Sequence, residues 1–562
     1  MWQHNYQPVG GNLGLSALVA AVPILVLFYM LGVRRKPTWM AAATALAAAW
    51  VVALTVYRMP IRYALMSTLN GAAFGMFPIA WIVFAAIMLY RLAVETGKFE
   101  IIKDSVGGLS NDRRLQGLFI AFSFGAFIEG AAGFGAPVAV AGAMLAGLGF
   151  PPFYAAGICL LANTAPVAFG SIGIPVVTLS GITNISALPL SAMVGRICAM
   201  VSVIIPFYLV VVMAGFRGAL EVMPAILVCG LSFAGVQFYV SNYIGPELTD
   251  ILSSLSCIIA MILVLKFWTP PTIMRLEGDK EATLAPKKHP GREVFVAWLP
   301  YLLLVVFVLT WGEVSIKAVL DRFSNGLLPG FLPLNPAVVN GINVPGLHNL
   351  IERIPPVTPK PSPYAAVYTL NWLSASGTSC FLAAIAAAIL LRVKPAQFAA
   401  TYVATFKQLK MSMVTIATML GLAYLMNYSG MTSTLGLALA ATGPTFPFFS
   451  AVLGWLGVFL TGSDTSANAL FGNLQVVTAN TLGLNPVLTA SVNSAAGVMG
   501  KMISLTSIAV AVAATGMTSA DESRLFRFTI KHSILLMLVM GVVSMLYAYV
   551  FPASWVPVVP PK

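Results

Sequence analysis

The sequence predicts an all-α polytopic membrane protein with about 12 transmembrane helices and two re-entrant helical hairpins. Of the 562 residues, 59% are hydrophobic and only 9% are charged. Apolar runs of about 20 residues, the length that crosses a bilayer as a helix, recur along the whole chain. Two further apolar runs are too long for one crossing and are interrupted by glycine. No stretch remains for a sizeable soluble domain, so residues 1–562 are interpreted as one membrane domain.

The first apolar run, 13–33, indicates how the chain enters the membrane. No Lys or Arg precedes it, and Arg34, Arg35 and Lys36 follow it directly. This flank is wrong for a signal peptide and typical of an anchor whose N-terminus lies outside. The predicted spans lie near 13–33, 38–57, 74–92, 153–181, 189–213, 220–240, 248–268, 294–312, 364–391, 411–430, 484–515 and 529–550.

The run 115–150 predicts the first hairpin. Glu129 is its one charged residue, within the string GAFIEGAAGFGAP at 125–137. As one helix, this run would extend for roughly 54 Å, against a hydrocarbon layer of roughly 30 Å. The glycines and Pro137 near its middle disfavour an unbroken helix. We therefore expect two half-helices that meet at a glycine tip, and such backbone at membrane depth should line a substrate site.

The run 446–480 is broken at GVFLTGSDTSANALFG (457–472) and predicts the second hairpin. Sliding it over the first pairs Gly125 with Gly457 and Gly130 with Gly462. Seven predicted spans separate the hairpins, so the two enter from opposite sides. The segments 115–181 and 446–515, each a hairpin followed by a broken span, are therefore predicted to form an inverted repeat, an architecture of secondary transporters.

Charge distribution sets the predicted orientation. Most Lys and Arg residues fall in loops of one side, which places both termini outside. The loop 313–363 is then external, and its Pro, Asn and Gly content predicts an irregular lid or spacer. A net charge of +13 indicates orientation rather than nucleic-acid binding, because the basic residues flank apolar runs. The five cysteines lie singly in apolar runs, against disulfides and zinc sites.

Ionisable side chains inside the predicted spans and hairpins need a reason, because each costs about 3 kcal/mol at depth. Asp464 is either a proton site or the N-cap of the following half-helix. Glu129 either titrates as well or neutralises Arg196 or Lys501. Lys501, which follows a break predicted at Gly497 and Gly500, offers a point charge to an anion or forms a structural ion pair. Arg196 either contacts the anion or snorkels outward.

Uncharged polar residues near the predicted breaks complete the candidate site. Side-chain amides and hydroxyls there either bind a ligand hydroxyl or join helices to one another. Half-helix N-termini add free amides for a carboxylate, and Phe134 and Phe169 are candidates to cover a short apolar tail. The candidate substrate-binding residues are Gly133, Gly135, Asn163, Thr164, Ser463, Thr465, Asn468, Asn493, Ser494, Lys501 and Arg196. No metal or cofactor is predicted, and the pattern fits small anions generally.

Six strings in order resemble the bacterial lactate permease family: WQHNYQP (2–8), EGAAGFGAP (129–137), NTAPVAFG (163–170), FLTGSDTSANALF (459–471), GKMIS (500–504) and LFRFTIKHS (525–533). The resemblance implies symport of L-lactate, D-lactate or glycolate with protons across a bacterial inner membrane, by elevator-type movement. The resemblance does not imply an oligomeric state. Ala496-Gly497 and Leu505-Thr506 depart from the family pattern and leave the helix break near Lys501 open.

Three other classes compete with this interpretation. A sodium-coupled carrier of another small carboxylate is the nearest, because unwound carbonyls at the tips can coordinate Na⁺. An intramembrane hydrolase is disfavoured, since the sequence contains no HExxH and no GxSG motif. A receptor has no need of two inverted broken hairpins. The sequence therefore predicts a transporter and not an enzyme.

Overall fold

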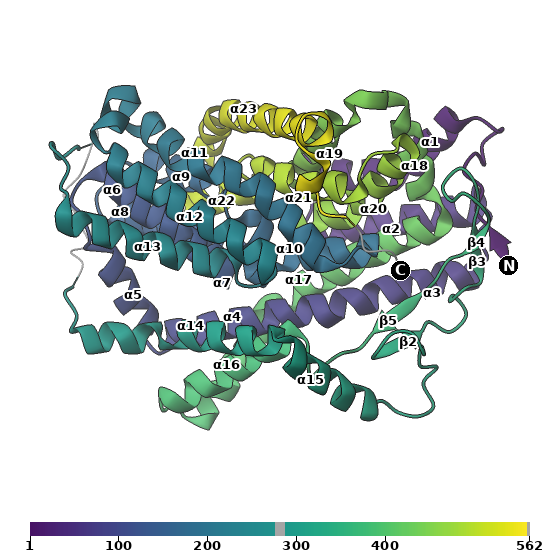
Figure 1. Cartoon of the computed structure of the whole chain (residues 1–562), viewed down its shortest axis with the longest axis horizontal. Helices are drawn as coiled ribbons and strands as arrows, with labels where there is room; N and C mark the ends of the chain where they lie inside the picture. The colour runs from purple at the N-terminus through teal and green to yellow at the C-terminus, as the bar shows by residue number, and fades with distance from the viewer. Residues whose placement is uncertain (276–286, 559–562) are drawn as a thin grey trace.

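The computed structural model describes residues 1–275 and 287–558. Within these residues, ten helices are long and apolar enough to cross a membrane, or up to twelve if each of two bent helix pairs counts as one span. The predicted all-α membrane protein is confirmed. In Figure 1 most helices run along the long axis of the molecule.

The helices before the first hairpin are α1 (Leu13–Phe28), η1 (Tyr29–Val33), α2 (Thr38–Thr55), α3 (Ile61–Phe74), η2 (Gly75–Ala80), α4 (Trp81–Glu95) and α5 (Lys98–Gly107). The first hairpin and the broken helix after it comprise α6 (Arg113–Gln116), η3 (Gly117–Phe124), α7 (Gly125–Ala131), α8 (Ala136–Gly147), α9 (Pro152–Ala162), η4 (Val167–Phe169) and α10 (Gly170–Thr183).

The middle of the chain forms α11 (Ala187–Glu221), α12 (Met223–Tyr243), α13 (Thr249–Phe267), α14 (Gly291–Gly312), α15 (Val314–Gly326), α16 (Ser376–Leu390), α17 (Pro395–Ser429), α18 (Met431–Leu439) and η5 (Ala440–Thr445). The last part forms α19 (Phe446–Thr461), α20 (Asp464–Leu482), α21 (Pro486–Lys501), α22 (Leu505–Ala514), η6 (Ser519–Asp521), α23 (Glu522–Tyr549) and η7 (Ala553–Trp555).

Both predicted hairpins are broken where the glycines predict it. The chain leaves helical geometry over 132–135 in the first hairpin and at Gly462 and Ser463 in the second. The two arms of each hairpin pack against each other, α7 on α8 and α19 on α20. Each hairpin is followed by a bent pair, with angles of 62° between α9 and η4–α10 and 41° between α21 and α22. The local elements thus match the prediction, and the inverted relation between them stays a prediction.

Several predicted spans are longer or shorter than expected. The span predicted at 74–92 belongs to one run of helix over Ile61–Glu95, and that at 411–430 is the end of the 35-residue α17. The predicted boundaries lie where the apolar run ends, but each helix continues through the polar residues beside that run until a helix cap ends it. The span predicted at 364–391 begins only at Ser376, since residues before it form a strand and turns.

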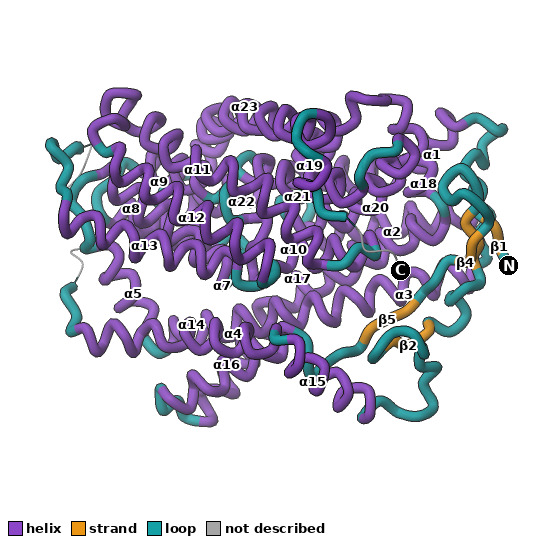
Figure 2. Tube along the Cα trace, in the orientation of Figure 1, coloured by secondary structure: helices purple, strands orange, loops and turns teal. Residues whose placement is uncertain are grey.

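The loop 313–363 is more ordered than the irregular segment predicted from its composition. It contains α15 and the strands β2 (Gly341–Asn343), β3 (Ile351–Arg353) and β4 (Ser362–Pro363). β1 (Trp2–Gln3) pairs in parallel with β3, and β2 pairs with β5 (Val367–Thr369). Figure 2 shows these strands beside the N-terminus. The N-terminus and this loop therefore lie at the same end of the molecule.

His4 fixes the N-terminal strand to the helices. A ring nitrogen lies 2.9 Å from the Tyr428 carbonyl oxygen, at the end of α17, and the ring packs against Gly430. Burial lowers the pKa of His4 to about 4. The ring is therefore neutral at pH 7 and joins the strand to α17 without adding a buried charge.

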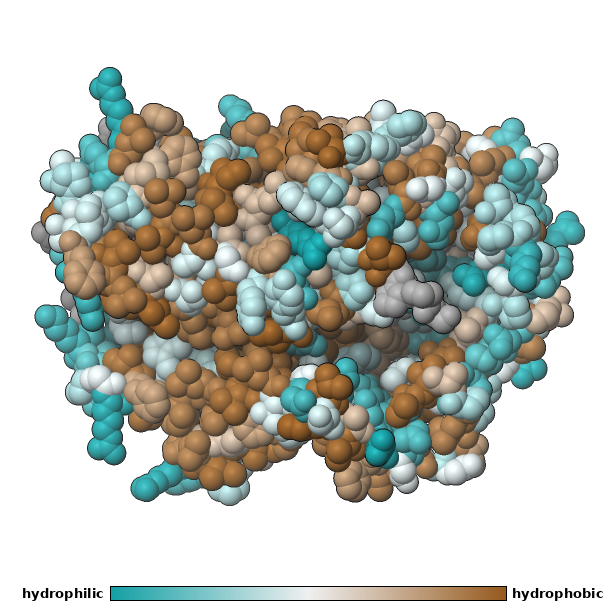
Figure 3. Space-filling model, in the orientation of Figure 1, coloured by the Kyte–Doolittle hydropathy of each residue, from teal (hydrophilic) through white to brown (hydrophobic). Residues whose placement is uncertain are grey.

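The surface separates into apolar and polar zones. Figure 3 shows hydrophobic side chains over much of the face that the long helices form, and hydrophilic side chains gathered toward the two ends of the long axis. A protein that crosses a membrane along its long axis needs this distribution, because lipid covers the middle and water covers the ends.

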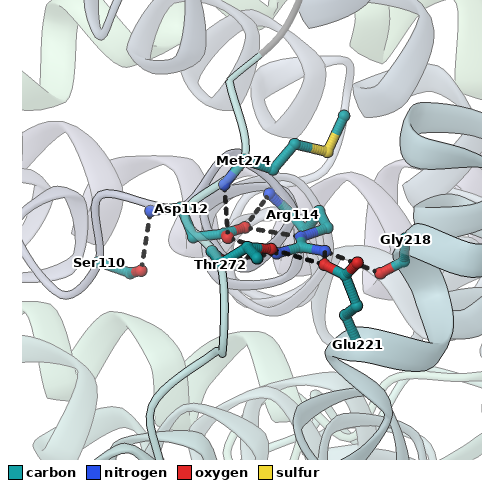
Figure 4. Close-up of polar contacts among 7 residues, drawn as sticks. All are labelled: Ser110, Asp112, Arg114, Gly218, Glu221, Thr272 and Met274. Atoms are coloured by element: carbon teal, nitrogen blue, oxygen red, sulfur yellow. Dashed lines mark hydrogen bonds and ion pairs between the residues drawn. The ribbon is translucent and has the colours of Figure 1, made fainter.

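The base of the first hairpin is held by a buried ionic cluster, drawn in Figure 4. The Arg114 guanidinium donates to Asp112 (2.8 Å), to Glu221 at the end of α11 (2.7 Å) and to the Thr272 carbonyl (2.8 Å). Asp112 also accepts from the Met274 amide. The cluster therefore ties the hairpin to α11 and to the chain that follows α13.

Candidate functional site

One cavity lies where the hairpin tips and the broken helices meet. Its volume is about 240 Å³, below the roughly 300–1,000 Å³ of pockets for drug-sized ligands. The N-terminal ends of four helices line it: α8 at Gly135, the regular part of α10 at Ile174, α20 at Ser463 and α22 at Thr506. Helix N-termini carry partial positive charge and free amides, so their convergence favours a small anion.

The first tip is built from backbone. Gly133 has φ of +61° and Gly135 has φ of +84°, which side-chain-bearing residues rarely adopt. A Cβ on Gly133 would stand 2.0 Å from the Ser171 Oγ, so Gly133 also permits the contact with α10. Gly135 lines the cavity as the cap residue of α8, and no side chain caps that helix. The predicted glycine tip thus exposes helix amides to the cavity.

The start of α10 has an unusual backbone. Ser171, Ile172 and Gly173 have φ of 46°, 59° and 71° in succession, although Ile strongly disfavours this region. Ser171 Oγ donates to the Ala132 carbonyl of the first tip at 2.8 Å. Strain of this kind persists only where the surroundings impose it, and it clusters at functional sites. The break therefore joins the first tip directly to the cavity wall.

The second tip is built from side chains. Ser463 is the N-cap of α20, and its Oγ accepts from the Ser466 amide at 3.3 Å. Asp464 is thus the first residue of the helix and not its N-cap, which corrects that alternative. Its Oδ2 accepts from Ser494 Oγ at 2.5 Å and from Asn468 at 3.4 Å, while its Oδ1 has no partner in the described residues. Asp464 lines the cavity with Ser463 and Thr465.

Behind Asp464, amide side chains connect three helices. Asn468 Nδ2 donates to the Pro175 carbonyl in α10 at 3.1 Å, and Asn468 Oδ1 accepts from Asn493 at 2.9 Å. Asn493 Oδ1 in turn accepts from Gln475. Asn468, Asn493 and Ser494 are fully buried and do not line the cavity. They hold Asp464 and the helices in place rather than contacting the cavity directly.

Lys501 ends α21 and lines the cavity. Its Nζ donates to the Gly462 carbonyl at 3.0 Å, so it also holds the second tip. It lies near enough to attract Glu129 and Asp464 electrostatically, and within the described part of the chain it closes no direct ion pair with either. The charge therefore remains available to an anion.

The break near Lys501 follows that residue instead of preceding it. Gly497 and Gly500, predicted to mark it, lie inside α21. A Cβ on Gly500 would stand 2.3 Å from the Trp455 carbonyl oxygen, and one on Gly497 would stand 2.8 Å from a Val458 methyl. These glycines permit α21 to pack closely on α19 and do not break the helix.

Glu129 lies on α7 and lines the cavity, and its buried Oε2 has no partner among residues 1–275 and 287–558. Asn163, just after α9, is buried beside Glu129, and neither atom of its amide closes a full hydrogen bond. Thr164 donates to the Leu161 carbonyl at 2.8 Å within its own helix end and does not line the cavity. Phe134 lines the cavity, whereas Phe169 is fully buried outside it.

Arg196 does not belong to the cavity. Its Nε donates to Asn242 on α12, and its NH1 donates to the Trp555 carbonyl near the C-terminus. It therefore neither neutralises Glu129 nor contacts a ligand in the cavity. The functional alternative for Arg196 fails, because α11 directs its side chain toward α12 and the C-terminal segment.

Sequence reasoning missed two groups of residues. Asp250, in the first turn of α13, lies inside the predicted span 248–268 and meets the criterion that selected Glu129, so the signal was present. Ser412 and Thr415 on α17 and Thr506 and Ser507 on α22 line the cavity, and hydroxyls of this kind carry no distinctive sequence signal. In the described residues no three His, Cys, Asp or Glu side chains gather as a metal site.

A multi-pass helical membrane protein with a polar cavity between two broken hairpins is a membrane transporter of small solutes. Comparisons with known proteins identify the family. The model of the L-lactate permease family matches residues 16–551, so the chain belongs to that family. It is a permease and not an enzyme.

Curated relatives match over nearly their full length. The chain is 48% identical to an L-lactate permease of Bacillus subtilis, over 99% of both chains. It is 45% identical to both the L-lactate permease and the glycolate permease GlcA of Escherichia coli K12, over 98% of each chain. Among solved structures, the Alcanivorax borkumensis YdaH transporter matches with a TM-score of 0.44 and 14% identity, covering 95% of this chain and 98% of that one.

Proposed function

We propose that this protein imports L-lactate, and also D-lactate and glycolate, by proton symport across the inner membrane of a bacterium. The observation that carries the proposal is the meeting of four helix N-termini and Lys501 at one small cavity. Two kinds of positive end, backbone dipoles and an ammonium, then face one carboxylate. The names of the relatives, which include lactate and glycolate permeases, supply the substrate class.

The cavity wall suits a short 2-hydroxy acid. Lys501 and the amides at the helix N-termini bind the carboxylate. Thr415 and Ser507 offer hydroxyls to the substrate hydroxyl, and Val510 and Ile174 are apolar neighbours for a methyl group. Glycolate lacks that methyl group, so it loses only the apolar contact, which costs about 0.8 kcal/mol per methylene-sized group.

Charge balance couples the proton to the anion. With Lys501 charged and both Glu129 and Asp464 ionised, the three side chains leave one net negative charge, which opposes an anion. Protonation of Asp464 removes that charge, and the substrate carboxylate then enters a neutral site. Because each event favours the other, proton and substrate are carried together. Asp464 is the coupling group of this scheme, since its Oδ1 is buried without a partner.

The moving parts of the proposed elevator are the two hairpins and the broken helices that follow them. The remaining wall of the cavity comes from α17 and α1, through Thr415, Met419 and Leu27. Substrate is released when the hairpin elements slide past this wall. Both termini and the loop 313–363 lie outside in this scheme, as the distribution of Lys and Arg favours.

Uptake into proteoliposomes tests the ion. Purified protein is reconstituted, and accumulation of labelled L-lactate is followed under an imposed pH gradient or an imposed sodium gradient. We expect the pH gradient to drive accumulation and the sodium gradient to have no effect. The reverse result would make the protein a sodium-coupled carrier of small carboxylates, the alternative that the tip carbonyls leave open.

The variant Asp464→Asn tests the coupling group. The amide keeps the shape of a protonated carboxyl, so lactate-for-lactate exchange should persist while accumulation driven by a pH gradient is lost. Glu100→Gln, a matched change of an exposed carboxylate on α5, serves as the control and should accumulate lactate normally. Undiminished accumulation by Asp464→Asn would move the proton to Glu129 or to the substrate.

A further inference from the structure

Three acidic residues follow one another from the α12–α13 loop to the cavity. Glu247 lies in that loop, Asp250 lies in the first turn of α13, and Glu129 lies on α7 and lines the cavity. α7 packs directly on α13. No part of the transport scheme above uses Glu247 or Asp250.

Asp250 is buried, and among the residues that the structure describes neither of its carboxylate oxygens has a partner. An ionised carboxylate in that position would lose its hydration with nothing in return, at a cost of many kcal/mol, so the group is held as the acid. α13 presses it against the first hairpin: a Cβ on Gly130 would stand 2.7 Å from the Asp250 Cβ. Asp250 therefore packs against Gly130, the residue that directly follows Glu129.

Asn163 supplies an independent observation at the same place. It is 4% exposed and lies against Glu129, and within the described parts of the chain neither amide atom closes a hydrogen bond of full geometry. Buried amides are nearly always hydrogen-bonded in folded proteins. Together with Glu129 Oε2 and both Asp250 oxygens, five unpartnered polar atoms border this part of the first hairpin. Such a concentration indicates a place where protons, or the waters that carry them, are bound during part of the transport cycle.

Glu247 lies between this place and the start of α16. It is partly exposed, and its Oε1 accepts from Ser376 Oγ at the start of α16 at 3.1 Å. The loop also touches the distorted start of α10, because a Cβ on Gly173 would stand 2.7 Å from Pro246. Glu247 therefore lies beside α15 and the start of α16, and its neighbour Pro246 contacts α10, an element that moves in the proposed elevator.

We propose that Glu247, Asp250 and Glu129 form the route by which protons reach the cavity, with Asp250 as the obligatory middle carrier. The route rests on the proposed proton symport. In each step a carboxylic acid passes one proton to the next carboxylate and becomes ionised, without any change of oxidation state. Lys317 lies near Glu247 and Lys501 lies near Glu129, so a cation stands at each end of the route, while Asp250 has Glu129 and Cys198 as its titratable neighbours.

Asp250→Asn is the decisive variant. Proteoliposome uptake driven by a pH gradient should fall roughly 100-fold, the order of magnitude that one positioned proton-transfer group contributes, while lactate-for-lactate exchange persists. Asp250→Glu should recover net uptake, because it restores an ionisable carboxyl. Ser253→Ala, one turn further along α13 and hydrogen-bonded only to its own helix at Thr249, is the matched control and should behave as the unaltered protein.

Glu247→Gln keeps the test decisive if Asp250→Asn does not fold, because Glu247 is partly exposed. It should slow net uptake more than exchange. Net uptake by Asp250→Asn or Glu247→Gln at the unaltered rate would overturn the route, as would equal losses of exchange and net uptake in a variant of normal thermal stability. If the unaltered protein itself accumulates no lactate under a pH gradient, the proposed symport fails instead. The two failures are thus distinguishable.

Discussion

The two hairpins differ in the groups that build their bases and their tips. The first has the ionic cluster of Asp112 and Arg114 at its base and a tip of glycine backbone. The second begins at Phe446 with an uncharged, aromatic base and has the hydroxyls and carboxyl of 463–466 at its tip. Two elements of similar shape therefore meet at one cavity with different chemistry.

This difference assigns them different tasks. Backbone amides at the first tip have a fixed charge distribution, so in the proposed mechanism their own attraction for an anion does not change with pH. The second tip contains Asp464, whose charge changes when a proton binds. One hairpin thus contributes constant attraction, and the other makes that attraction conditional on a proton. If the hairpins descend from an inverted repeat, the common shape was kept while the polar groups diverged.

The largest expected effect concerns the base of the first hairpin. Arg114→Met leaves Asp112 buried without its guanidinium, and removing one partner of a buried ion pair costs about 3–5 kcal/mol. The cost should fall near 3 kcal/mol, since the Arg114 and Met274 amides still donate to Asp112. Thermal unfolding in detergent measures it, with Arg217→Met, an exposed residue of α11, as the control. An unchanged unfolding temperature would show that the cluster does not hold the first hairpin.

The glycine backbone of the first tip is tested by Gly133→Ala. The methyl group would stand 2.0 Å from Ser171 Oγ at a φ of +61°, so the tip must move and transport should fall below detection. Gly483→Ala is the matched control, because Gly483 has φ of +68° and nothing within 4 Å of its Cβ position. This control variant should be destabilised only by the backbone strain of its alanine, which costs about 1–2 kcal/mol. Comparable uptake rates in both variants would mean that contact with Ser171 is not required.

The hairpins themselves were predictable from the sequence because their cause is local. Glycine and proline at the middle of an overlong apolar run decide the break within a few residues, whatever packs around it. The cavity residues Asp464 and Lys501 were predictable for a similar reason, since a charged side chain at membrane depth stands out against an apolar background.

Errors arose where the outcome depended on neighbours distant in sequence. Gly497 and Gly500 match the pattern of a helix break, and only the approach of α19 shows that they serve close packing. Arg196 and Asn493 likewise have their partners on other segments, at Asn242 and at Asn468. Local sequence describes what a residue can do, and the packing of helices selects one of those uses.

A smaller effect is expected when the charge of Lys501, which lies near groups of both hairpins, is removed. Lys501→Gln removes the ammonium that we propose binds the substrate carboxylate and keeps a donor for the Gly462 carbonyl. Hydrogen bonds to charged groups contribute about 1.5–3 kcal/mol, so the KM for lactate should rise about 10-fold to 150-fold. Lys407→Gln, on the exposed side of α17, should leave the KM unchanged. An unaltered KM in Lys501→Gln would mean that helix amides alone bind the anion.

The smallest effect is expected at Ser463, the side chain that caps α20 at the second tip, whereas no side chain caps α8 at the first tip. Ser463→Ala removes the oxygen that accepts from the Ser466 amide, and loss of such an N-cap costs about 1 kcal/mol. The freed amide then faces the cavity as those of α8 already do at Gly135. Because an uncapped amide also attracts an anion, we expect lower thermal stability together with an unchanged or slightly lower KM for lactate. A higher KM would instead show that Ser463 contacts the substrate, and the second tip would then bind the anion through its side chains.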